Sequence, residues 1–348
     1  MDPRDASDSR LVALTRWVVE DLGFSGSRIE SASADASFRR YFRLTRDADT
    51  YIVMDAPPDR ENVLPFVDVA QRLAGMNLNV PIVLARDLAQ GFLLLSDLGS
   101  RQYLDELEAN RAVDQLYGDA LEALVTMQKP GGAQALGLPA YDRASLLREM
   151  ALFPEWFLAR HLGFNVGGDE RGMLERLFDA LLQTALSQPM AFVHRDYHSR
   201  NLLLTAEHNP GILDFQDAVY GPITYDAVSL LKDCYISWPA PRVRGWLLDY
   251  RARLTRAGVA VGEDEAEFIR WFDLMGLQRH IKVLGIFARL FYRDGKPGYL
   301  KDLPRVLDYA RATASAYRET AEFARFITAR IDPAFVAAQM RAPPKVPA

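Results

Sequence analysis

The sequence predicts an α+β protein in two parts, a small antiparallel β-sheet followed by a longer, mainly helical region. Strand-like patterns separated by turn residues dominate the chain up to about residue 98, and long helical patterns dominate after it. A chain of 348 residues is also long enough for two domains. We therefore expect domains at 1–98 and 99–340, and a disordered tail rich in proline and lysine at 341–348.

Two further patterns support the sheet and its covering helices. Residues 8–22 carry apolar side chains at helical spacing, and Gly23 suits the end of that helix. Residues 41–45 and 50–55 alternate apolar and polar side chains around the turn RDAD, which predicts a hairpin. The same reasoning predicts a helix at 61–73 and two more strands at 81–88 and 92–95.

The second part is expected to be helical with one interruption. Residues 190–220 hold the short apolar runs AFV, NLLL and GILDF, which predict strand, loop, strand, turn and strand. Helical periodicity covers 102–128, 145–162, 170–187, 242–257, 264–292 and 303–331.

Composition narrows the class of protein. Hydrophobic residues make up 49% and charged residues 25%, which permits ordinary buried cores. The net charge of −5 argues against nucleic acid and anionic membrane as main partners. Cys234 is the single cysteine, which excludes an internal disulfide framework, and only five histidines are present, so a Cys/His zinc site is not expected.

Targeting features are absent from the sequence. The N-terminus shows no basic start followed by an apolar run, and no stretch of about 18 apolar residues occurs. We therefore expect a cytoplasmic protein with no membrane or nucleic-acid partner and no obligate protein partner.

The stretches FVHRDYHSRNLLL (192–204) and PGILDFQD (210–217) carry the chemistry. Asn201 follows Asp196 by five residues, and Asp214 follows Asn201 by 13. A hairpin through NLLL and GILDF would return Asp214 beside the other two. Oxygen ligands suit Mg²⁺ rather than zinc, and a remaining carboxylate can take a proton from a hydroxyl, which fits phosphoryl transfer. Taken singly, such residues are commonly turn residues or helix caps.

This pattern resembles the catalytic loop of protein-kinase-like enzymes, H-x-D-x-x-x-x-N, with LDFQD where they carry D-F-G. The resemblance is greatest to the aminoglycoside phosphotransferase branch, and within it to the kinases of cell-wall sugars. The strings that carry it are SADASFRRYFRL (33–44), MDAPP (54–58), VHRDYHSRNLLL (193–204), LDFQDAVYGPITYDAVSLLKDCY (213–235) and LQRHIKVLGIF (277–287).

The resemblance implies a bilobal protein-kinase-like fold that binds ATP and Mg²⁺ between its lobes. It implies phosphorylation of N-acetylmuramic acid or N-acetylglucosamine at the anomeric hydroxyl, in peptidoglycan recycling. Asp196 is expected to be the catalytic base or to orient the hydroxyl, and Asn201 and Asp214 to bind Mg²⁺. His194 and Asp226 are expected to support the loop, although Asp226 is also suited to cap a helix.

Two departures from the kinase pattern concern the nucleotide. No glycine-rich loop is present, so backbone N–H groups and the Ser37 hydroxyl would face the phosphates, with charge from Arg39 or Arg40. In the alignment of VMDAPP, Asp55 stands where these enzymes carry a phosphate-binding lysine. Either Arg40 or Arg43 on the neighbouring strand replaces that lysine, or the alignment is out of register. Adenine is expected against the backbone at residues 96–98, from Ser96 to Leu98.

Candidates for the acceptor site are few. Gln216 and Asp217 directly follow Asp214, and Trp156 and Arg160 lie four apart on a helix, where they suit a sugar ring and a carboxylate. The alternative for this pair is a core tryptophan with a surface arginine. His280 and Lys282 lie in a predicted long helix; surface positions are expected for both, and the alternative is that they line the acceptor cleft.

The sequence leaves other functions open. One is a kinase for an aminoglycoside, choline or homoserine. Another is a nucleotide-binding module without turnover, motivated by Asp55 in the lysine position. A purely structural helical scaffold leaves the 194–214 pattern unexplained. The preferred sugar, its anomer and the oligomeric state are not readable from the sequence.

Overall fold

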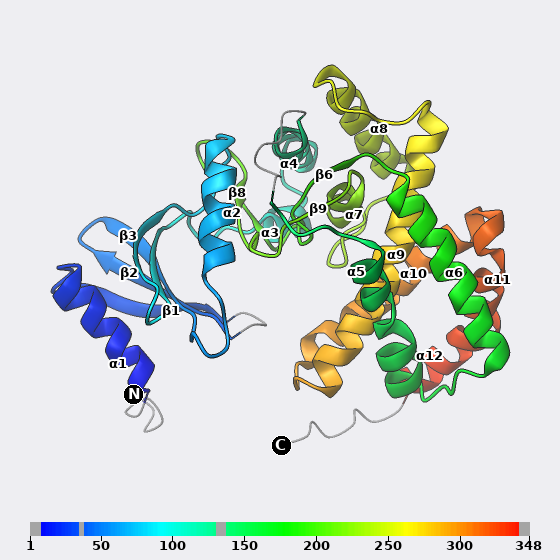
Figure 1. Cartoon of the computed structure of the whole chain (residues 1–348), viewed down its shortest axis with the longest axis horizontal. Helices are drawn as coiled ribbons and strands as arrows, with labels where there is room; N and C mark the ends of the chain where they lie inside the picture. The colour runs from blue at the N-terminus through cyan, green and yellow to red at the C-terminus, as the bar shows by residue number, and fades with distance from the viewer. Residues whose placement is uncertain (1–7, 35–37, 130–136, 341–348) are drawn as a thin grey trace. The chain divides into compact units, whose positions relative to one another are not determined.

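The computed structural model describes residues 8–34, 38–129 and 137–340, and divides the chain into two compact units (Figure 1). The first unit comprises Met1–Gln102 together with Leu202–Asp217, and the second comprises Tyr103–Asn201 and Ala218–Ala348. The first unit therefore takes a segment that the sequence interpretation assigned to the second. The predicted tail at 341–348 and Ser37 lie outside the described residues.

The first unit is built on an antiparallel sheet with the strand order β1-β2-β3-β5-β4. Gly91 between β4 and β5 needs to be glycine, because its φ is 74° and a Cβ there would lie 1.9 Å from the carbonyl oxygen of Ala56. The strands are β1 (Arg28–Ala34), β2 (Arg40–Arg46), β3 (Asp49–Asp55), β4 (Val83–Asp87) and β5 (Phe92–Ser96).

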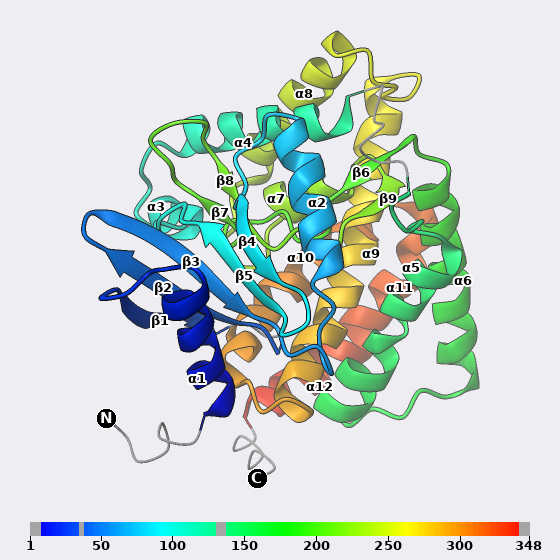
Figure 2. The ribbon, with the colours of Figure 1, turned by 60° about the vertical axis from the view of Figure 1, so that its left-hand side comes forward.

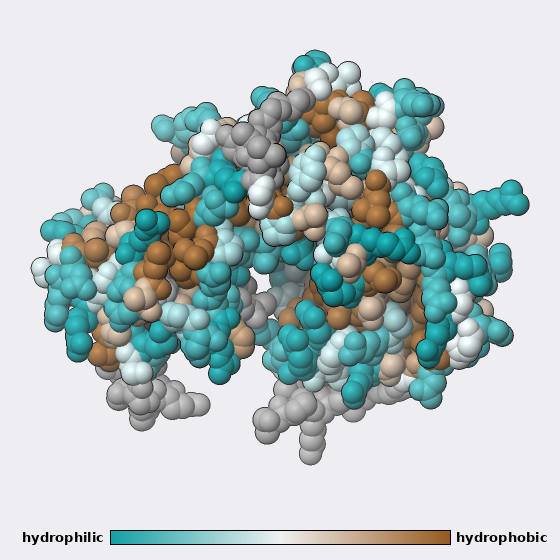
Figure 3. All heavy atoms as spheres, viewed as in Figure 1, coloured by the Kyte–Doolittle hydropathy of each residue, from teal (hydrophilic) through white to brown (hydrophobic). Residues whose placement is uncertain are grey.

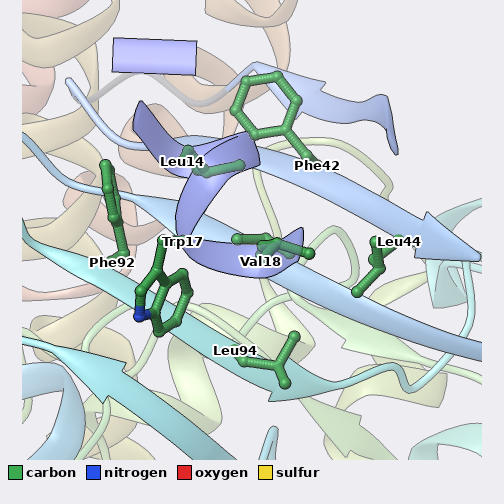
Figure 4. Packing of buried hydrophobic residues seen from close by; sticks show 8 residues of the cluster. Leu14, Trp17, Val18, Phe42, Leu44, Phe92 and Leu94 are labelled. Atoms are coloured by element: carbon green, nitrogen blue, oxygen red, sulfur yellow. The ribbon is translucent and has the colours of Figure 1, made fainter. Parts of the chain in front are cut away.

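Helix α1 (Ser9–Arg16), continued by the π-helix η2 (Trp17–Asp21), covers one face of this sheet. Its start is capped by Asp8, whose side chain accepts a hydrogen bond from the Leu11 N–H at 3.1 Å. Alternate residues of a strand point to one face, so β2, β3 and β5 present one shared apolar row to the helix. Figure 4 shows the resulting core, with Leu14, Trp17, Val18, Phe42, Leu44, Phe92 and Leu94 labelled, and Val53 belongs to the same core.

Helix α2 (Leu64–Gly75) also belongs to the first unit and lies alongside the sheet (Figure 2). The predicted hairpin of NLLL and GILDF is confirmed as β7 (Leu202–Leu203) paired with β8 (Gly211–Ile212). Phe215 just beyond it is fully buried, and its ring centroid lies 4.9 Å from that of Phe66 on α2. The hairpin is thus part of the first unit's core.

The second unit is helical, apart from a short antiparallel pair of β6 (Met190–Val193) and β9 (Val219–Pro222). The central helix is α9 (Glu265–Tyr292), as predicted; it is buried along most of its length, which is typical of a helix surrounded by others. The remaining helices are α3 (Tyr103–Glu108), α4 (Val113–Gln128), α5 (Arg143–Met150), η4 (Phe153–His161), α6 (Gly168–Leu186), α7 (Tyr225–Leu231), α8 (Ala240–Arg256), η5 (Pro297–Asp302), α10 (Leu303–Ala316), η6 (Arg318–Thr320), α11 (Ala321–Phe326), η7 (Ile327–Ile331) and α12 (Asp332–Gln339).

Three predicted long helices are divided in the structure. The pattern at 102–128 breaks at Asn110 and Ala112, where φ is 52° and 47°. The pattern at 145–162 is interrupted near Pro154, whose missing N–H cannot continue the α-helical ladder, and a π-helix follows. The pattern at 303–331 breaks at Tyr317, whose φ and ψ of −124° and 139° are extended.

The described residues contain no helix long and apolar enough to cross a membrane. Figure 3 shows a face on which hydrophilic side chains predominate and hydrophobic ones gather in patches, one of them over the first unit.

Candidate active site

The loop from His194 to Asn201, called the catalytic loop below, follows β6 and is held by Asp226 at the start of α7. One Asp226 oxygen accepts the His194 N–H at 2.6 Å, and the other accepts the Arg195 N–H at 2.9 Å. Asp226 is fully buried, and burial raises its pKa to about 7. These are the contacts of a brace, the role that the resemblance implied for Asp226.

A second buried carboxylate, Asp233, holds the other end of the catalytic loop. Its Oδ2 accepts hydrogen bonds from the Ser199 N–H at 3.0 Å and from the Ser199 hydroxyl at 2.5 Å, while Oδ1 accepts the Tyr235 N–H at 2.9 Å. The sequence interpretation missed Asp233. Asp233 lies seven residues after Asp226, at the end of the run AVSLLKD. That spacing identifies it only when the path of the catalytic loop is known.

Asp196 is half-buried within this braced loop. The Asn201 amide donates a hydrogen bond from Nδ2 to the Asp196 carbonyl at 2.9 Å, and the Asp196 N–H donates to His194 Nδ1 at 3.3 Å. Burial acts to raise the pKa of Asp196, but Lys282 and Arg279 lower it to about 2. Asp196 is therefore an anion at neutral pH. Such a weak base suits a role in orienting a hydroxyl and receiving its proton late.

The two cations lie on α9 and are buried, so the expectation of a surface Lys282 is wrong. Lys282 Nζ donates to the Tyr225 hydroxyl at 2.9 Å. Arg279 donates to the Arg195 carbonyl at 3.1 Å and to the same hydroxyl at 3.2 Å. His280 is buried too, with its pKa lowered to about 3 by burial. The reason is that α9 is surrounded by other helices, so polar residues on any of its faces are enclosed.

Asp214 lies in the first unit, two residues after β8, with φ of 61°. Left-handed φ at a non-glycine residue is strained and is frequent at functional sites. Its Oδ1 accepts a hydrogen bond from Gln216 Nε2 at 2.8 Å, and Arg39 Nη2 lies 3.8 Å from the same oxygen. Gln216 Nε2 also lies 3.3 Å from the exposed Asp217 carboxylate. Thus Arg39, Gln216 and Asp217 cluster around Asp214.

The register of the sheet explains which face the Asp55 side chain lies on. It pairs with Arg40 and lies on the same face as Val53, which packs against α1. The fully buried Asp55 carboxylate accepts hydrogen bonds from Arg10 Nε at 2.9 Å and from Arg40 Nη2 at 2.5 Å. Asp55 therefore forms a charge-compensated link between α1 and the sheet, and the alignment that placed it beside phosphates was out of register.

The other residues of the first unit that were predicted to bind the nucleotide also contact neighbours within that unit. Arg40 additionally bonds Asp8, whereas Arg43, on the opposite face of β2, donates to Asp97 at 2.7 Å and to the Gly99 carbonyl at 3.2 Å. The Ser96 N–H donates to the Ile82 carbonyl at 3.0 Å. Leu98 is half-buried, with its Cδ1 3.1 Å from the place that a Cβ on Gly211 would take.

Trp156 and Arg160 lie on η4, where Trp156 is half-buried and Arg160 is exposed. Within the described part of the chain, no hydrogen bond, ion pair or ring contact joins either side chain to the catalytic loop. The structure thus brings His194, Asp196, Asn201 and Asp226 together in the second unit, and Arg39, Asp214, Gln216 and Asp217 together in the first.

Comparison with known proteins defines the class. The model of the phosphotransferase enzyme family matches residues 28–268. Solved structures share the fold: an ethanolamine kinase of Plasmodium vivax has a TM-score of 0.62 at 11% identity, with 89% of each chain covered. The GDP complex of aminoglycoside 2'-phosphotransferase-IIIa has a TM-score of 0.60 at 15% identity, covering 89% of this chain and 100% of that one. The chain belongs to the phosphotransferase enzyme family and is a small-molecule kinase with the predicted bilobal α+β fold.

Closer relatives are bacterial proteins named N-acetylmuramate/N-acetylglucosamine kinase. The relative from Pseudomonas aeruginosa is 51% identical over 85% of this chain and 86% of its own length. The relative from Pseudomonas putida is 46% identical, covering 92% and 96%, and that from Neisseria meningitidis is 44% identical, covering 90% and 93%. The resemblance stated from the sequence is confirmed over most of the chain.

Proposed function

We propose that this kinase transfers the γ-phosphoryl group of ATP to the anomeric hydroxyl of N-acetylmuramic acid and N-acetylglucosamine, in the cytoplasm, as a step of cell-wall sugar recycling. The observation that carries the reaction is the catalytic loop, where two buried aspartates brace the backbone and cationic neighbours keep Asp196 ionised. The sugars are proposed from the names of the relatives, and the anomeric position from the sequence resemblance.

Asp196 has the role of aligning the sugar hydroxyl and accepting its proton. Its negative charge orients the O–H bond, and the proton passes to Oδ as the hydroxyl oxygen bonds to phosphorus and the bond to the ADP oxygen breaks. Asn201 assists from the same loop, because its amide fixes the Asp196 carbonyl.

Mg²⁺ is proposed as the metal, since Asn201 and Asp214 both offer hard oxygen ligands. The Asn201 amide nitrogen donates to the Asp196 carbonyl, and an amide would coordinate Mg²⁺ through its oxygen. When bound, Mg²⁺ neutralises charge on the phosphates. The described residues contain no group of three or more His, Cys, Asp or Glu arranged to hold a metal ion. Mg²⁺ in nucleotide sites commonly keeps water and phosphate oxygens as ligands beside one or two protein oxygens.

For the phosphates we propose Arg39 in preference to Arg40. Arg39 lies beside Asp214, whereas Arg40 lies on the α1 face and bonds Asp8 and Asp55. The hypothesis of a nucleotide-binding module without turnover loses its motivation, because Asp55 is turned towards α1 and paired with two arginines.

The test is ³¹P NMR of the protein with ATP, Mg²⁺ and separate acceptors: N-acetylmuramic acid, N-acetylglucosamine, kanamycin and choline. We expect a sugar 1-phosphate signal with the two sugars. Asp196→Asn should reduce turnover by about 10²- to 10⁴-fold, the range of general acid–base catalysis. Transfer only to kanamycin or choline would overturn the substrate assignment, and full turnover by Asp196→Asn would overturn the role of Asp196.

A further inference from the structure

Glu149, near the end of α5, is a buried carboxylate at the centre of an ion-pair cluster beside the catalytic loop. Its side chain is 13% exposed. It accepts hydrogen bonds from the Tyr141 hydroxyl and the Arg195 guanidinium, and Lys282 Nζ lies 3.1 Å from its Oε1. Three donors, from the segment before α5, the catalytic loop and α9, therefore converge on one carboxylate, and ionised partners make these hydrogen bonds strong.

Arg195 links this cluster to the reacting residue. It directly precedes Asp196, so its backbone conformation determines where Asp196 points. Its φ is 77°, a conformation that non-glycine residues rarely adopt and that the surroundings must enforce. Asp226 holds its N–H and Arg279 holds its carbonyl. The side chain is held as well, because Glu149 bonds the guanidinium, which also lies 5.5 Å from the centroid of the Tyr141 ring.

The charges show why a carboxylate is needed at this position. Arg195 and Lys282 both contact Glu149, and their side chains are only 25% and 7% exposed. Two like charges enclosed together repel each other unless an anion lies between them. Without that anion the Arg195 guanidinium is driven towards solvent, and the strained backbone that it anchors is released.

We propose that Glu149 is a positioning residue: by holding Arg195, it keeps the catalytic loop in the conformation that places Asp196 for reaction. Its effect on turnover rests on the proposed function, whereas its effect on loop order does not. The structural part is therefore tested separately from the kinetic part.

The structural test is amide hydrogen exchange of residues 190–204 in the full chain, comparing wild type with Glu149→Gln. The amides of His194, Arg195 and Ser199 are hydrogen-bonded and should exchange at least about tenfold faster in the variant, because exchange follows local opening. Glu149→Asp keeps the charge and should retain most of the protection. The proposal is overturned if a folded Glu149→Gln variant exchanges these amides at the wild-type rate. It is also overturned if Glu149→Asp exchanges them as fast as Glu149→Gln does.

Asp273 provides a matched control within the same unit. Its carboxylate, 24% exposed, also lies between a lysine and a tyrosine hydroxyl: Lys232 Nζ at 2.8 Å and Tyr317 at 2.7 Å. Asp273→Asn should leave exchange of the catalytic loop and turnover close to wild type. An equal loosening of the loop in Asp273→Asn would show general destabilisation and overturn a specific role for Glu149.

The kinetic test separates kcat from KM. Glu149→Gln should lower kcat by about 10- to 100-fold, the cost of misplacing a reacting group by about 1 Å, with KM for ATP nearly unchanged. The double variant Glu149→Gln/Arg195→Gln should be no slower than Arg195→Gln alone, since both act through one contact. Additive losses overturn the proposal. If wild type transfers phosphate to no acceptor, the proposed function fails and the exchange experiment still decides the role of Glu149.

Discussion

Glu149 and Asp196 make the stability of the fold depend on pH in a definite direction. Burial acts to raise the pKa of Glu149, but Lys282 and Arg195 lower it below its ordinary value, and the pKa of Asp196 is about 2. A carboxyl group whose pKa is lowered by folding stabilises above its unfolded pKa of about 4, and this stabilisation is lost as pH falls below that value. We expect the unfolding free energies of wild type and Glu149→Gln, from urea titrations, to converge as pH falls from about 5 through the folded-state pKa of Glu149. A difference that stays constant with pH would contradict this.

The sequence predicts the site residues that lie close to one another along the chain. Asp196, Asn201 and Asp214 are recognisable because one short loop and one hairpin carry them. Glu149 and Asp233 were missed, since their partners come from other elements and only the fold brings them together. Asp55 was placed beside the phosphates, but its side chain lies on the face of the sheet that packs against α1, and the direction of side chains alternates along a strand.

At the scale of elements, the close approach of α9 to the segment before η4 depends on Gly285. A Cβ there would lie 2.5 Å from the carbonyl carbon of Leu152, which is backbone and cannot rotate away. Gly285→Ala should therefore lower the unfolding free energy by about 1–3 kcal/mol, the usual cost of overpacking. Gly245→Ala on α8 meets no atom within 4 Å and should raise it by up to about 1 kcal/mol, because alanine favours helix. The midpoints of urea unfolding check this prediction: we expect a lower midpoint than wild type for Gly285→Ala and a higher one for Gly245→Ala.

Periodicity predicted most elements but few of their interruptions. The hairpin at 41–55 and the helix at 264–292 are present because alternation and helical spacing persist along each. Asn110 is a local signal for a helix end, whereas Ala112 and Tyr317 carry none. Strand β9 was not distinguished from the turn before it, since its sequence VYGP contains Gly221 and Pro222, which are typical of a turn.

On the scale of the whole molecule, the first unit is discontinuous in sequence. The chain leaves it at Gln102, builds part of the second unit, returns for Leu202–Asp217 and leaves again. The boundary predicted at residue 98 divides the chain once, and composition cannot show that a later segment returns to the first unit. That requires pairing over long sequence separations, such as the Ile212 N–H bonded to the Asn79 carbonyl at 2.8 Å.

This discontinuity predicts how the chain can be divided. A fragment of residues 1–102 lacks Leu202, Ile212 and Phe215, which are all fully buried in the intact protein. Each such side chain contributes about 1.5–3 kcal/mol by burial, and their loss exposes the side of α2 that meets Phe215. We expect the fragment to show poorly dispersed amide signals in ¹H–¹⁵N NMR, and residues 202–217 joined by a flexible linker to restore dispersion. The same linked segment with Phe215→Ala should restore less. A well-dispersed spectrum of 1–102 alone would show instead that the sheet and α1 form a sufficient core, and that the hairpin is an addition to a unit already stable.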